Sequence, residues 1–234
     1  MPYRYISILP ATTIYNEVLS RCGVDSIEEG WLYQKEFLQP NLSLLYGADS
    51  VDGYDNFMPE RVSKVLSKLA TEQTLHGNSV VQAPGSVQEK INGVIENRSL
   101  YKFLNIRFVV SGYPIHHEDF RLVSERQIGA CKTPIYLYEL SGYMPRYYVA
   151  AAKPQSYDSI SVLNQIKPQY EARKTILNVQ ITEDGYLMIG NAFLSDYIIT
   201  VNGQKVEPEL VMDIFMGLPL KQGAHTIEII FPAW

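Results

Sequence analysis

Long apolar runs, a basic excess and a signal-peptide pattern are all missing from this sequence of 234 residues. No segment offers the ~18 consecutive apolar residues that a membrane-spanning helix needs. Met1 is not followed by the charged and then apolar residues of a signal peptide. We therefore expect this stretch of chain to be water-soluble by itself. The formal net charge of -5 gives no basic surface that would neutralise phosphates, so we expect no nucleic-acid partner.

Motifs of the common soluble enzyme classes are also absent. Neither Gly-x-Ser-x-Gly nor His-Glu-x-x-His occurs, and phosphate-binding loops and dinucleotide fingerprints are missing. The two cysteines, Cys22 and Cys131, lie far apart without metal-ligand spacing. Two buried thiols are favoured over one long-range disulfide, and the redox state stays open. We expect no catalytic residue, metal or cofactor on this chain by itself.

Helical and strand patterns alternate over the first two thirds of the chain. Pro59 suits a first helical position, and the apolar residues that follow it form one stripe. A second helical pattern opens at Ser86 and resumes after a break near Leu100. The patterns also predict a helix at 13–22 near the start of the chain. They predict strands at 4–9, 106–110, 134–138 and 146–152.

From about Lys153 onward no helical stripe recurs, and short strands separated by turns are predicted. The sharpest local signal is Asn202-Gly203, since this dipeptide favours the two positive φ angles of a type I′ hairpin. We expect it to join strands at 197–201 and 204–206. The predicted fold class is an α+β portion over residues 1–152, followed by a small antiparallel, jelly-roll-like β-sandwich over residues 153–234. Further strands of the sandwich are expected at 176–181, 185–189 and 226–231.

Short motifs in a preserved order resemble the extracytoplasmic region of the YfhO family of membrane glycosyltransferases. The first are Asn-Leu and Tyr-Gly within residues 41–47, Gly-Tyr-Asp at 53–55, and Pro-Glu-Arg at 59–61. Further along, the strand at 104–110 and the series Tyr-Glu with Met-Pro-Arg within 138–146 are similar to family motifs. The resemblance spans about residues 4–232.

This resemblance implies an extracytoplasmic location, periplasmic or at the cell surface, in a parent protein attached to the membrane. Its embedded part would transfer sugars from a polyprenyl-phosphate donor, with the catalytic carboxylate between membrane helices. The partners implied are those missing helices and a cell-envelope saccharide or lipid-linked sugar. The chain would stop at Trp234, where the family enters a membrane helix, and Trp suits such a border.

Arginines and tyrosines are the residues that we single out as ligand-binding candidates. The guanidinium groups could bind an anionic ligand bidentately. Structural ion pairs with carboxylates explain these arginines about as well. An inward-facing Arg107 would need a carboxylate partner, for which Asp52 or Asp55 is the first expectation. Tyrosines suit pyranose stacking, although packing in the core is the favoured interpretation. The candidates are Tyr46, Asp52, Tyr54, Arg61, Arg107 and Arg146.

The histidines do not indicate a metal site or an acid–base site. His116-His117-Glu118 has no evident third metal ligand, so a solvated loop is favoured, and His225 suits a structural hydrogen bond.

The main hypothesis is a non-catalytic accessory domain that positions a saccharide or polymer acceptor. One alternative is a contributor to a glycosyl-transfer cleft, with Asp52 and Arg61 at its edge. The other is a structural or protein-interaction module of the cell envelope.

Overall fold

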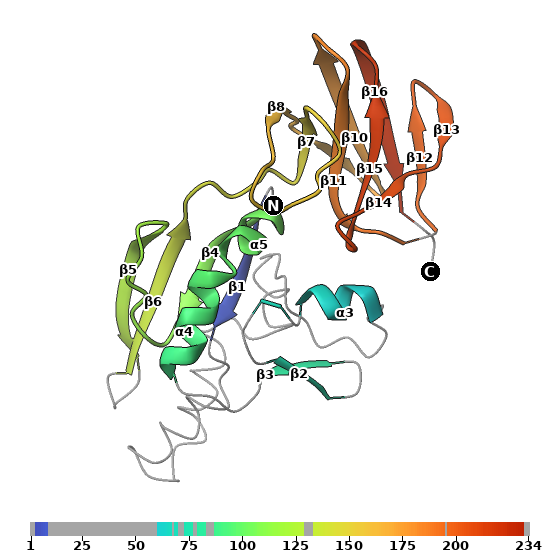
Figure 1. The fold of residues 1–234 in the computed structure, drawn as a ribbon. Helices are drawn as coiled ribbons and strands as arrows, with labels where there is room; N and C mark the ends of the chain where they lie inside the picture. The colour runs from blue at the N-terminus through green and yellow to red at the C-terminus, as the bar shows by residue number, and fades with distance from the viewer. Residues whose placement is uncertain are drawn as a thin grey trace. The chain divides into compact units, whose positions relative to one another are not determined.

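The computed structural model describes residues 3–8, 60–66, 68–69, 73–76, 79–82, 87–128, 133–194 and 196–231. Contacts divide the chain into two compact units, Met1–Met144 and Pro145–Trp234, which are treated separately. The described structure is mostly β, with few helices and several antiparallel sheets (Figure 1). None of the described helices combines the length and apolar character needed to cross a membrane.

A four-stranded sheet forms the body of the first unit. Its order is β1-β4-β6-β5, with β1 parallel to β4 and the other neighbours antiparallel. The predicted strands at 4–9, 106–110 and 134–138 are confirmed, whereas β5 was missed because nearly all of its side chains are exposed, so that no apolar face marks it. The bounds are β1 (Arg4–Ile8), β4 (Ile106–Ser111), β5 (Phe120–Ile128) and β6 (Thr133–Leu140).

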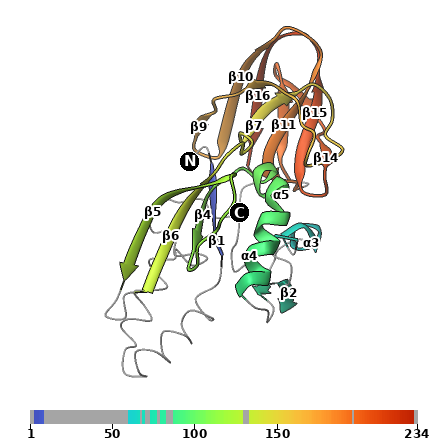
Figure 2. The same ribbon diagram turned by 60° about the vertical axis from the view of Figure 1, so that its left-hand side comes forward.

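Helices of the first unit follow the predicted stripes. The helix expected after Pro59 is α3 (Glu60–Leu66), in which Val62 and Val65 are buried. The pattern that opens at Ser86 forms α4 (Val87–Glu96), and the expected break falls at Asn97. Figure 2 shows α4 and α5 (Arg98–Phe103) lying along one side of the sheet. The helix predicted at 13–22 lies outside the described residues.

A separate two-stranded pair, β2 (Gln73–His76) with β3 (Ser79–Gln82), also belongs to the first unit. The sequence showed only a short apolar pair at this place. Both strands have four residues, which is too short for an alternating pattern to stand out.

The second unit is the β-sandwich that the sequence predicted. Two antiparallel five-stranded sheets, in the orders β13-β12-β16-β10-β9 and β14-β15-β11-β7-β8, contribute side chains to one apolar core. Along β10 the inward positions alternate with exposed ones, as a half-buried strand requires. The bounds are β7 (Tyr147–Ala150), β8 (Val162–Gln165), β9 (Gln169–Glu171), β10 (Lys174–Ile181), β11 (Gly185–Ala192), β12 (Ile198–Val201), β13 (Gln204–Val206), β14 (Glu209–Val211), β15 (Phe215–Leu220) and β16 (Gly223–Ile230).

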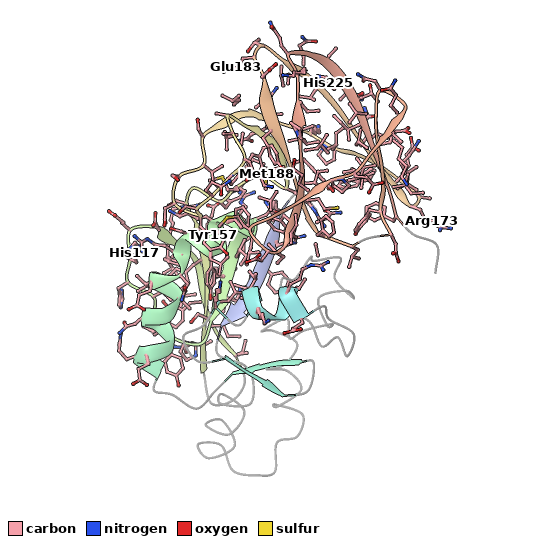
Figure 3. All side chains as sticks on the ribbon, turned by 45° about the vertical axis from the view of Figure 1, so that its right-hand side comes forward. His117, Tyr157, Arg173, Glu183, Met188 and His225 are labelled. Atoms are coloured by element: carbon pink, nitrogen blue, oxygen red, sulfur yellow. The ribbon has the colours of Figure 1, made fainter. Side chains whose placement is uncertain are left out.

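The hairpin predicted at Asn202-Gly203 is confirmed. Both residues have positive φ angles, 51° and 79°, and Val201 lies opposite Gln204. The Asn202 side chain also accepts a hydrogen bond from the Thr226 amide at 2.9 Å, which ties the turn to β16. Figure 3 places His225 and Glu183 at one end of the sandwich and Arg173 at the other.

The boundary between the units lies earlier than the sequence suggested. We expected it between residues 152 and 153, where helical patterns end, but the contacts divide the chain after Met144. Strand β7 therefore belongs to the sandwich, where it pairs with β11 and β8. A fully buried strand has no alternating pattern and can suit either neighbouring sheet, so its sequence does not tell which one it joins.

Candidate functional site

Arg107 is an extra residue in β4, and its guanidinium group contacts a carboxylate on the neighbouring strand β6. Between β1 and β4, Arg4 lies opposite Ile106 and Tyr5 lies opposite Phe108, so Arg107 is the unpaired residue of a β-bulge. Bulges redirect side chains and are common beside functional sites. Arg107 contacts Glu139 of β6, which lies directly opposite Phe108.

Glu139 binds two arginines. The Nε atom of Arg107 donates to its Oε1 at 2.8 Å, and the guanidinium of Arg121, on β5, pairs with Oε2. Since Arg121 lies directly opposite Glu139 in the sheet, the second contact follows from the strand register. The Arg107 and Glu139 side chains are 31% and 19% exposed, whereas Arg121 is 69% exposed. The pairs therefore lie at the surface, where a ligand can reach them.

Three aromatic rings surround the Arg107 guanidinium. Its central carbon lies 4.8 Å from the ring centre of Tyr3, 4.9 Å from that of Phe108 and 5.5 Å from that of Tyr143. Guanidinium groups pack favourably against aromatic rings at such distances. All three rings are only partly buried. We call this set the Arg107 cluster; its members are Tyr3, Arg107, Phe108, Arg121, Glu139 and Tyr143.

Ion pairing shifts the pKa values of Glu139 and Arg107 in opposite directions. Hydrogen bonds from Arg107 and Arg121 lower the pKa of Glu139 below its ordinary value. The hydrogen bond to Glu139 likewise raises the pKa of Arg107. At neutral pH the Glu139 carboxylate is therefore ionised and accepts hydrogen bonds from both guanidinium groups.

A Glu139→Gln variant is expected to show a weaker pH dependence of stability on the acid side. The folded pKa of Glu139 is lowered, so its contribution to stability is complete above the ordinary carboxyl pKa and is lost as pH falls through the folded value. Urea unfolding from about pH 7 to about pH 3 would show the difference between the two proteins shrinking at acid pH. A difference independent of pH would contradict this ion pairing.

A second polar cluster, around Asp119, has a structural role. Arg98 and Lys102 of α5 pair with its carboxylate at 3.1 Å each, and the Ser141 hydroxyl donates to it at 3.0 Å. Burial alone would raise the pKa of Asp119, but hydrogen bonds from Lys102 and Ser141 bring it below its ordinary value. These contacts join α5 to the loop before β5 and to the turn after β6.

Two of the four histidines make structural contacts. His117 accepts a hydrogen bond from the Asp119 amide through Nδ1, and His225 bonds the Lys221 carbonyl through Nε2 at 2.6 Å. Within the part of the chain that the structure describes, no group of three or more His, Cys, Asp or Glu side chains is placed to hold a metal ion.

The arginines predicted as candidates are distributed over both units. Arg107 belongs to the first unit, as does the half-buried Arg61 of α3. Arg146 lies in the second unit, where its Nε donates to Asn191 Oδ1 at 3.1 Å. Among the described residues, Arg107 pairs with Glu139, which the neighbouring strand presents in register. The partners expected from the sequence, Asp52 and Asp55, are not among those residues. Tyr46, Asp52, Tyr54, Asp55 and both cysteines lie outside the described residues.

The tyrosines of β6 are mainly packing residues. Tyr138 is buried, and its hydroxyl accepts a hydrogen bond from the Ile115 amide at 2.9 Å. It stacks with the half-buried Tyr136 at a centroid distance of 6.3 Å. The core interpretation of Tyr138 is therefore confirmed.

Five members of the Arg107 cluster were missed by sequence reasoning: Tyr3, Phe108, Arg121, Glu139 and Tyr143. One available signal was a glutamate within the otherwise apolar strand 134–140, since a charged residue in such a strand implies a partner. The identity of that partner depends on the β5–β6 register, which the sequence did not reveal.

Comparison of the chain with protein-family models, with curated proteins and with solved structures gave no match.

Proposed function

We propose that this chain is a non-catalytic, extracytoplasmic accessory domain of a multispanning, glycosyltransferase-like membrane protein similar to the YfhO family. Its role would be to hold a cell-envelope saccharide or polymer acceptor, at the periplasmic face or the cell surface. The proposal includes an α+β class for the first unit and a jelly-roll-like topology for the sandwich. The observation that carries it is the Arg107 cluster, in which partly exposed rings surround charged hydrogen-bonding groups.

The chemistry of the Arg107 cluster suits a saccharide. Aromatic faces pack against the apolar side of a pyranose, and the Tyr3 and Tyr143 hydroxyls add donors and acceptors. Glu139 accepts hydrogen bonds from hydroxyl groups, and Arg107 donates them. All of these groups come from a sheet and the segments beside it, which hold them in place before a ligand arrives.

The ionisation of Glu139 favours binding over catalysis. General acid catalysis in glycosyl chemistry needs a carboxyl group whose pKa is raised toward neutrality. Two guanidinium groups lower the pKa of Glu139 instead. The cluster therefore supports the accessory role more than the alternative of a contribution to a glycosyl-transfer cleft.

A binding screen with glycans and lipid-linked saccharides, followed by titration of the hits, tests this proposal. We expect saturable binding by this chain and an affinity at least about tenfold lower for Arg107→Gln, because a hydrogen bond to a charged group contributes about 1.5–3 kcal/mol. Arg126→Gln is the matched control, since Arg126 is an exposed arginine further along β5. Tyr143→Ala provides a second variant if Arg107→Gln does not fold.

The proposal fails if no saccharide binds, or if folded Arg107→Gln and Tyr143→Ala both bind as well as the parent chain. A protein-interaction module is the second candidate, favoured by the edge strand β5, on which Leu122 and Val123 are 48% and 45% exposed. Edge strands with exposed apolar residues are typical sites of strand addition. Concentration-dependent self-association without any saccharide binding would support this second candidate.

A further inference from the structure

The Arg107 cluster contains more positive than negative charge. Among the described residues, both Arg107 and Arg121 have Glu139 as their ion-pair partner, so two guanidinium groups share one carboxylate. The cluster thus keeps a net charge of one positive unit within a chain whose formal net charge is -5. A local charge of opposite sign to that of the whole protein attracts an anionic group to this position.

Most donors of Arg107 have no hydrogen-bond partner among the described residues. A guanidinium group has five N–H donors, and the hydrogen bond described for Arg107 uses only its Nε. The remaining donors lie in the plane of a group that three rings and one carboxylate hold in place. Such a planar, oriented fork matches the two oxygens of a carboxylate.

Arg121 adds a second cation that a ligand can reach more easily. Its side chain is 69% exposed and lies on the edge strand β5. An exposed arginine can change rotamer to meet an anion without disturbing the sheet. Arg107 therefore provides an oriented fork, and Arg121 provides an exposed positive charge beside it.

We infer that the Arg107 cluster selects a saccharide that carries a carboxylate, such as a uronic acid residue, with the carboxylate bound by Arg107 and Arg121 and the sugar ring against Tyr3 or Tyr143. This inference rests on the proposed function and names its ligand class. One carboxylate neutralises the single excess charge. A phosphate monoester would bring about two negative charges and leave the cluster negative.

Paired ligands isolate the contribution of the carboxylate. A panel of uronic-acid oligosaccharides is titrated against this chain, each beside its methyl ester, which keeps the ring and its hydroxyl groups and removes the charge. We expect the acids to bind at least about tenfold more tightly than their esters, as a charged hydrogen bond predicts. We also expect added salt to reduce this preference.

Two variants locate the effect. Arg121→Gln is expected to reduce the preference for acid over ester at least about tenfold, as the loss of a charged hydrogen bond predicts. Arg126→Gln removes the same charge from the same strand and is expected to leave the preference unchanged. An equal loss in both variants would show that only overall charge matters and would overturn the inference.

The remaining outcomes separate this inference from the function on which it rests. Equal affinity for acids and esters would overturn the inference and leave saccharide binding intact. Absence of binding to every acid and ester would overturn both. Tighter binding of phosphorylated saccharides than of the uronic acids would overturn the assignment of a carboxylate.

Discussion

Leu187→Ala is expected to lower the free energy of unfolding of the sandwich by about 3 kcal/mol, because deletion of a fully buried leucine side chain removes apolar contacts and leaves a cavity. Leu187 lies in β11, has no exposed surface and belongs to the core that both sheets share. Strands β15 and β7 flank β11, so the surrounding backbone has little freedom to close the cavity.

Urea unfolding followed by circular dichroism measures this loss. Leu210→Ala is the control, since Leu210 is also a leucine of the sandwich but is 39% exposed. We expect the control to cost less than about 1 kcal/mol, as most surface substitutions do. Equal losses at the two positions would show that the shared core is not what stabilises this unit.

Gly217→Ala is expected to cost about 2–3 kcal/mol, because the position has no room for a side chain. A Cβ atom there would lie 2.4 Å from the Tyr186 ring and 2.8 Å from the Leu187 carbonyl oxygen. Tyr186 is buried, and its hydroxyl donates to Glu209 at 3.1 Å, so the ring cannot move aside without losing this bond. Backbone and ring must therefore shift together.

Gly203→Ala is the matched control for the glycine prediction. Nothing lies within 4 Å of the Cβ atom that it would add, but the residue has a φ of 79°. Only conformational strain is then expected, about 1 kcal/mol. Thermal melts of both variants compare steric crowding with backbone strain, and a Gly217→Ala melting temperature equal to that of the parent would contradict the described packing.

The Arg107 cluster shows why sequence reasoning recovered only part of the candidate site. Arg107 attracted notice because it stands within an apolar strand, and a carboxylate partner was expected. The partner Glu139 and the second cation Arg121 depend on the register of β4, β6 and β5. Register is set by the whole sheet, and Arg107 itself is an extra residue of β4 that no local pattern marks.

Short stretches of sequence were enough to predict several helices, the β-sandwich and one hairpin turn. The apolar stripes predicted α3 and α4, the absence of helical patterns after Lys153 predicted a β-sandwich, and Asn202-Gly203 predicted a hairpin turn. Each of these features depends on a few residues close together in the sequence: a helical stripe, strand alternation or a dipeptide that tolerates positive φ.

Tertiary structure alone decided which strands pair, where the units divide and which charges meet. Strand β7 joined the second unit, and β5 paired with β6 although its own sequence showed no strand pattern. These outcomes depend on contacts between residues far apart along the chain, and the free energy of such contacts comes from packing and register that no local pattern encodes. The sequence by itself determined several of the helices and strands and an arginine in need of a partner; the assembled sheet determined the partner, the aromatic rings around it and the excess charge.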